Sequence, residues 1–237
     1  MMGVVYAAGL TQGLTGFGFS LVTVPVVVII LGPKTAVPVI MLLSLVLNVM
    51  LYAQSRKWSD TRRIRPLIIA GIASVPLGAL LLVMLDPSVL KLVVGCAIFG
   101  FALASLLGFR REVRNERLGF VGVGLVSGTL NGAISTSGPP VILFLANQGV
   151  TKRTFRASLV TYFLFLNLAA LPVYLIGGLM SVRIVKLAGL LVGPMLLGAW
   201  SGSRLVGAVP EKAFRSTTLA IVLATGVLAV LSSLGLV

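Results

Sequence analysis

Residues 128–140 read GTLNGAISTSGPP, and residues 13–20 read GLTGFGFS. Each stretch lies near the middle of a long apolar block, 118–146 and 3–31 respectively. Glycine and proline weaken a helix, and hydroxyl residues favour helix ends over helix interiors. Each block is therefore interpreted in one of two ways. It is a broken, re-entrant helical hairpin, or it is one tilted helix whose glycines permit close packing.

Six further apolar blocks have the length of single membrane-spanning helices, which need about 20 apolar residues each. They cover residues 36–54, 64–85, 88–108, 156–180, 184–206 and 213–236. Of the 237 residues, 58% are hydrophobic and only 10% are charged, whereas an average soluble domain has about 25% charged residues. We therefore predict an all-α integral membrane protein with eight hydrophobic segments, and not a soluble enzyme or a nucleic-acid-binding protein.

The two glycine-rich blocks also mark an internal repeat. At an offset of 115 residues, matching positions are Gly9 and Gly124, Gly13 and Gly128, Ser20 and Ser135, and Pro25 and Pro140. A four-residue insertion after these positions aligns Asn48 with Asn167. We interpret residues 1–115 and 116–237 as two homologous halves of one integrated transmembrane domain.

The 19 lysines and arginines distinguish between the two interpretations, because short cytoplasmic loops are enriched in these residues. If every block crosses the membrane once, 11 basic residues lie on one side and 8 on the other. If the glycine-rich blocks are hairpins, 15 lie on one side, in residues 56–65, 110–117, 152–156 and 204–215. The hairpin arrangement fits better. It gives each half a hairpin plus three transmembrane helices, so the halves are inverted repeats, as in secondary transporters.

The residue types available within the blocks exclude several kinds of chemistry. The chain has no His and a single Cys, Cys96, and its five acidic residues lie in loops or at helix ends. Catalytic and metal sites need such groups. We therefore predict no enzyme activity, no catalytic or metal-binding residues, and no cofactor besides a possible coupling proton or sodium ion. These absences leave an anionic or a neutral substrate, and an anion could bind at helix N-termini through free N–H groups and the helix dipole.

The predicted substrate site lies where the two broken segments meet. Small and hydroxyl residues there provide helix N-caps and close backbone approach, and three asparagines adjoin the breaks or lie inside apolar spans, where a buried amide needs a partner. The site residues are Ser135, Thr136, Ser137, Gly138, Asn131, Ser20, Thr23, Gly16, Gly18, Asn48 and Asn167. For the asparagines, bridging between neighbouring helices stays open as the alternative. Gln12 and Thr15 are weaker candidates because the first half is less polar.

Two repeated glycine-rich segments, each followed by a proline and then by an asparagine-containing span, resemble the TauE/SafE sulfite exporter family, also called TSUP. The resemblance covers essentially the whole chain and is strongest over residues 13–25 and 124–140. It implies transport of sulfite or a related organosulfur anion across the cell membrane. The chain departs from the family where residues 135–137 carry hydroxyls in place of denser glycine, which leaves the choice of anion open.

These observations predict a multi-pass protein of the cell (inner or plasma) membrane that acts as a secondary transporter, an exporter or permease, of a small anion by alternating access. A passive anion channel and a transporter of a small carboxylate are the alternatives. The expected partners are the anion and membrane lipids, with a homodimer possible and no nucleic acid.

Overall fold

The computed structural model describes residues 1–86, 89 and 115–206. Within these residues the regular structure is entirely helical. The helices are α1 (Met2–Thr15), α2 (Phe19–Leu31), α3 (Pro33–Ser55), the short 3-10 helix η1 (Arg56–Trp58), α4 (Thr61–Met84), α6 (Glu116–Ile134), α7 (Gly138–Asn147), α8 (Lys152–Ile176) and α9 (Val182–Leu205). The predicted spans 88–108 and 213–236, together with Cys96, lie outside the described residues. The prediction of an all-helical chain is confirmed for the rest.

Five helical segments are long and apolar enough to cross a membrane: α3 with η1, α4, α6, α8 and α9. Their outward faces carry large exposed apolar side chains, among them Leu77, Leu118, Leu190 and Leu197. The amides Asn48 and Asn167, in contrast, are almost completely buried. An apolar exterior around a partly polar interior suits a lipid environment, in which buried polar groups must find partners inside the protein.

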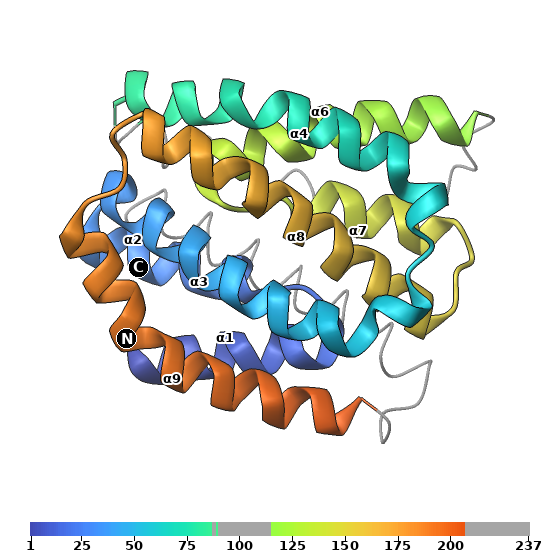
Figure 1. The fold of residues 1–237 in the computed structure, drawn as a ribbon, viewed down its shortest axis with the longest axis horizontal. Helices are drawn as coiled ribbons and strands as arrows, with labels where there is room; N and C mark the ends of the chain where they lie inside the picture. The colour runs from blue at the N-terminus through green and yellow to red at the C-terminus, as the bar shows by residue number, and fades with distance from the viewer. Residues whose placement is uncertain (87–88, 90–114, 207–237) are drawn as a thin grey trace.

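Both glycine-rich blocks are broken in the middle, so neither forms one tilted helix. The first block gives α1 and α2, separated by Gly16–Gly18, and the second gives α6 and α7, separated by 135–137. α2 and α7 are short, with 13 and 10 residues. Figure 1 shows that α2 returns toward the end of the molecule at which α1 begins, and that α7 likewise returns toward the beginning of α6. The two breaks therefore lie in the interior.

Most of the basic residues gather at one end of the molecule, which we call the basic end: residues 56–65, 116–117, 152–156 and 204–206. Arg63 forms an ion pair with Glu116 at 2.7 Å, the Arg153 guanidinium lies 5.6 Å from the centroid of a Trp58 ring, and Lys152 Nζ donates to the carbonyl oxygen of Val206. At the opposite end, Lys34 Nζ donates to the Val83 carbonyl. This grouping of the described residues agrees with the hairpin arrangement and contradicts one crossing per block.

Close helix pairs connect the two parts of the chain. α1 packs along α9, and α4 packs along α6. A Cβ added at Gly13 would collide with the Ala199 carbonyl oxygen, and one added at Gly128 with the Gly71 carbonyl oxygen. Glycine at these positions allows the backbones to approach as membrane helices commonly do. Each broken segment is thereby fixed against a long helix that comes from the other part of the chain.

Candidate functional site

α1 and α6 each end at a residue in the left-handed backbone conformation. Gly16 caps α1 with φ 85° and ψ 0°, and Ser135 caps α6 with φ 50° and ψ 26°. Ser135 is the one non-glycine residue with positive φ in the described part of the chain. The left-handed conformation costs such a residue about 1–2 kcal/mol. The following helices begin at Phe19 and Gly138.

The helix boundaries correct the register of the repeat. α1 and α6 end at Thr15 and Ile134, α2 and α7 begin at Phe19 and Gly138, and α3 and α8 begin at Pro33 and Lys152. All three pairs are 119 residues apart, so no insertion is needed. The offset of 115 was wrong by four residues, about one helical turn. Glycines recur at similar spacing in both blocks, so they match again after a shift of one turn.

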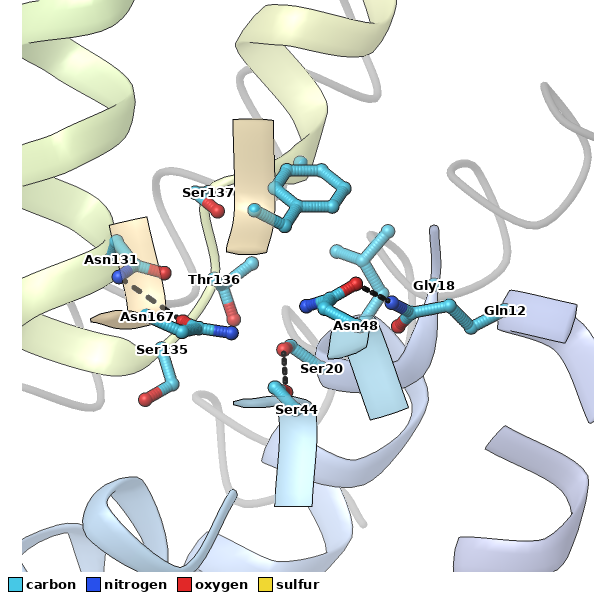
Figure 2. A pocket seen from close by; sticks show the side chains of 13 residues that line it. Gln12, Gly18, Ser20, Ser44, Asn48, Asn131, Ser135, Thr136, Ser137 and Asn167 are labelled. Atoms are coloured by element: carbon cyan, nitrogen blue, oxygen red, sulfur yellow. Dashed lines mark hydrogen bonds between the residues drawn. The ribbon is translucent and has the colours of Figure 1, made fainter. Parts of the chain in front are cut away.

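A pocket of about 30 Å³ lies between the two breaks (Figure 2). It is small, but a cavity needs only about 10–15 Å³ to hold one water molecule. Nine of the eleven predicted site residues line it, and none of the described lining residues carries a charge. The lining residues are Gln12, Gly18, Ser20, Leu21, Ser44, Asn48, Asn131, Ser135, Thr136, Ser137, Gly138, Phe163 and Asn167.

Two predicted site residues do not line the pocket. The Thr23 hydroxyl donates to the Phe19 carbonyl oxygen at 2.7 Å, inside its own helix. Gly16 packs against Arg156 of α8, and a Cβ added at Gly16 would lie 2.7 Å from Arg156 Cγ. Gly16 therefore contributes to the break from outside the pocket, and the Thr23 hydroxyl is occupied within α2.

Gln12 and Asn48 form a chain of hydrogen bonds that fixes which atom of Asn48 faces the pocket. The backbone N–H of Phe19 donates to Gln12 Oε1 at 3.2 Å, so the other end of Gln12 is the NH₂ group. That group, Gln12 Nε2, donates to Asn48 Oδ1 at 2.7 Å. Amide orientations are usually assigned from their hydrogen bonds, and here a backbone donor sets the order. The Asn48 NH₂ group therefore faces the pocket as a donor.

The second half holds a similar pair of amides. Asn131 Nδ2 donates to Asn167 Oδ1 at 3.5 Å, a longer contact than that between Gln12 and Asn48. Partners in both pairs are 36 residues apart. In Figure 2 the NH₂ groups of Asn48 and Asn167 point toward each other across the pocket. The side chains of Asn48 and Asn167 are 1% and 3% exposed, so these donors are enclosed by protein.

The hydroxyl residues of 135–137 are less available as donors than the sequence implied. Ser135 Oγ donates to the Val37 carbonyl oxygen at 3.0 Å, and Thr136 Oγ1 donates to the Ile134 carbonyl oxygen at 3.3 Å. Ser137 is the N-cap of α7 but makes no side-chain capping bond. The amides therefore contribute more of the directed donors in the pocket than the hydroxyls of Ser135 and Thr136 do.

Backbone N–H groups at the helix starts add further donors, unequally in the two halves. The first N–H groups of a helix have no partner within it. In α2, Gln12 takes that of Phe19, which leaves those of Ser20 and Leu21 for a ligand. In α7 the next residues after Gly138 are Pro139 and Pro140, which have no N–H.

Gln12 and Ser44 are pocket residues that the sequence analysis did not assign to the site. Ser44 lies one turn before Asn48 on α3, and its Oγ is 3.5 Å from Ser20 Oγ. At the corrected offset Gln12 corresponds to Asn131, which was assigned. The offset of 115 hid this match, whereas an offset of 119 would have pointed to Gln12 from the sequence.

The family model described as Sulfite exporter TauE/SafE matches residues 1–229. No curated protein and no solved structure was found to match the chain.

Proposed function

The chain belongs to the TauE/SafE sulfite exporter family, and we propose that it carries sulfite or a related small organosulfur anion by alternating access, with the anion held in the pocket between the two helix breaks. The family is one of membrane transporters and not of enzymes. The chain is accordingly a multi-pass membrane transporter, and the proposal concerns its substrate, its site and its mechanism.

One observation carries the proposal: the Asn48 NH₂ group faces the pocket because a backbone N–H fixes the amide relay. The oxygens of a sulfite or sulfonate group are strong hydrogen-bond acceptors. Asn48 and Asn167 supply donors from two sides, and the N–H groups of Ser20 and Leu21 add to them. Hydrogen bonds to a charged acceptor contribute about 1.5–3 kcal/mol each. The small volume of the pocket favours a small anion over an aromatic one.

The constant interval of 119 residues and the opposite directions of the two hairpins support an inverted duplication of residues 1–115 and 116–237. In this arrangement the basic end is cytoplasmic, because Lys and Arg accumulate on that side. Rocking of one half against the other would open the pocket to each side in turn, as in other transporters built from inverted repeats. A proton or sodium gradient, or the anion gradient itself, would drive the movement.

Substitutions at the two asparagines test the site. Asn48→Asp keeps the oxygen that accepts from Gln12 and replaces the facing donor with an anionic oxygen, so it should weaken sulfite binding at least tenfold. Asn167→Asp should act in the same direction. The matched control is Asn115→Asp at the N-cap of α6, outside the pocket, where aspartate caps as well as asparagine.

The measurement is thermal unfolding of purified protein with sulfite, thiosulfate, sulfoacetate, sulfate, acetate or chloride, each with and without sodium. A ligand that binds only the folded state raises the unfolding temperature by mass action. Selective stabilisation by a sulfur anion, lost in Asn48→Asp and kept in Asn115→Asp, supports the proposal. Stabilisation by acetate alone would favour a carboxylate transporter, and single-channel conductance in bilayers would favour a passive channel. Equal shifts in all variants would contradict the site.

A further inference from the structure

The hairpins create an electrostatic problem for an anion pocket. A helix N-terminus is equivalent to about half a positive charge and a C-terminus to about half a negative charge. At the first break, the end of α1 lies beside the start of α2. The two partial charges therefore largely offset each other, and the start of α2 cannot by itself make the pocket electropositive.

Arg156 of α8 lies against the end of α1. Its Nη2 donates to the Gly13 carbonyl oxygen at 2.7 Å and to Ser203 Oγ at 3.1 Å. Gly13 is the neighbour of Gln12, which begins the amide relay into the pocket. The Arg156 side chain is thus linked to the pocket through the last turn of α1.

The charge of Arg156 is not neutralised by a partner among the described residues. The residue is 9% exposed, both of its acceptors are neutral, and its Nε has no hydrogen-bond partner there. The one ion pair of the described residues joins Arg63 and Glu116. A buried cation without a counter-charge is strongly unfavourable unless something compensates it. A bound anion nearby would supply that compensation.

The second break carries a neutral group at the equivalent position. Gly132 is 119 residues after Gly13, and its carbonyl oxygen accepts a hydrogen bond from the Tyr174 hydroxyl at 2.6 Å. Both helix ends are therefore capped by a side chain from α8, by a cation at α1 and by a phenol at α6. Of these two groups only Arg156 carries a charge, so within the described residues the cap of α1 differs from the cap of α6 by one full positive charge.

We propose that Arg156 is a specificity-determining residue, which makes the pocket select anions by neutralising the negative end of α1 and adding a net positive charge without touching the substrate. This inference rests on the proposed function, because it assumes that the pocket holds an anion. A unit charge about 10 Å from another changes affinity by roughly tenfold at an effective dielectric constant of about 20. An effect of that size is expected when the charge is removed.

The sharpest test leaves Arg156 in place and cancels its charge. Ser203 is partly exposed and accepts from Arg156, so Ser203→Asp provides a counter-ion and Ser203→Asn is its neutral control of nearly equal size. We expect the sulfite dissociation constant of Ser203→Asp to be about tenfold higher than that of Ser203→Asn. A residue with only a structural role would not separate the two variants.

Charge removal provides the second test. Arg156→Gln should weaken sulfite binding about tenfold, whereas Arg156→Lys should keep most of the affinity. The control is Arg153→Gln, one turn earlier on α8, where the arginine is exposed. Chloride is measured alongside sulfite by the same thermal shift, because the charge acts on any anion. If Arg156→Gln fails to fold, the comparison of sulfite binding by Ser203→Asp and Ser203→Asn still tests the role of Arg156.

The outcomes separate this inference from the proposed function. Wild-type protein that binds sulfite, with equal dissociation constants for Ser203→Asp and Ser203→Asn, overturns the role of Arg156 alone. Wild-type protein that binds chloride but not sulfite overturns the proposed substrate, and the Ser203 pair then tests Arg156 with chloride. Wild-type protein that binds no anion overturns both.

Discussion

The hydrogen bond on one side of the Asn48 amide determines which atom its other side presents to the pocket. Asn48 offers an NH₂ group to the pocket because its oxygen is occupied by Gln12, and Gln12 is oriented by the backbone of Phe19. The sequence indicated that a buried asparagine must have a partner, which is a general requirement. It could not indicate which partner, because the two residues lie 36 positions apart on different helices.

Ser135 shows a second limit of sequence analysis at this scale. Its hydroxyl was assigned to the substrate, but it donates to the Val37 carbonyl oxygen and fastens the second break to α3. Ser135 nevertheless lines the pocket. Local sequence indicates a helix end, whereas the acceptor of the hydroxyl depends on a residue 98 positions away.

Substitutions at Ser135 should separate backbone strain from hydrogen bonding. Ser135→Ala keeps the unfavourable positive φ and loses the bond to Val37, so we expect a loss of about 1 kcal/mol in unfolding free energy. Ser135→Gly loses the same bond but relieves a strain of about 1–2 kcal/mol, so it should be nearly neutral. Denaturation in detergent measures both. A glycine variant less stable than the alanine variant would contradict the strain at this position.

Elements were predicted more successfully than contacts. All six apolar blocks within the described residues are helical, and both glycine-rich blocks are broken. The helices and their breaks can be predicted locally, because the length, hydropathy and glycine content of a block indicate where a helix forms and where it ends. The pairing of the repeats was wrong by one turn, because a periodic pattern of glycines cannot distinguish neighbouring turns.

The packing of α4 on α6 gives a prediction at the scale of elements. A Cβ added at Gly128 would meet the Gly71 carbonyl oxygen, whereas one added at Gly122 of the same helix meets nothing within 4 Å. Gly128→Ala should therefore lower stability by about 1–3 kcal/mol through overpacking. Gly122→Ala should raise it by up to about 1 kcal/mol through helix propensity. Thermal unfolding of the two variants compares them directly, and equal effects would contradict the close α4–α6 contact.

The uneven distribution of basic residues distinguishes the two ends of the molecule. The basic end combines residues from both halves of the chain, 56–65 and 152–156 among them. Counting lysines and arginines on the sequence was sufficient to predict this grouping, because orientation in a membrane depends on loop charges and not on the details of packing. The pocket, in contrast, is lined by residues on or beside six helices. A count of charged residues does not predict which helices meet there.

Cysteine labelling tests this direction. In a Cys96→Ser background, Gln54→Cys and Arg153→Cys should react with a membrane-impermeant maleimide from the cytoplasmic side. Lys34→Cys and Arg183→Cys should react from the opposite side. All four residues are exposed. One crossing per block would put residues 54 and 153 on opposite sides, so labelling of these two cysteines from different sides would contradict the hairpin arrangement.

The packing of α1 along α9 has a consequence for biosynthesis. Arg156 and Ser203 both reach Gly13, across sequence separations of 143 and 190 residues. Ribosomes add about 5–20 residues per second, so α1 leaves the ribosome roughly 10–40 s before α9 exists. Throughout that interval Gly9 and Gly13 lack α9, the helix against which they pack in the finished structure. The nascent chain therefore stays partly folded in the bilayer until α9 is made. The hairpin that is synthesised first is among the last parts of the protein to reach its final packing.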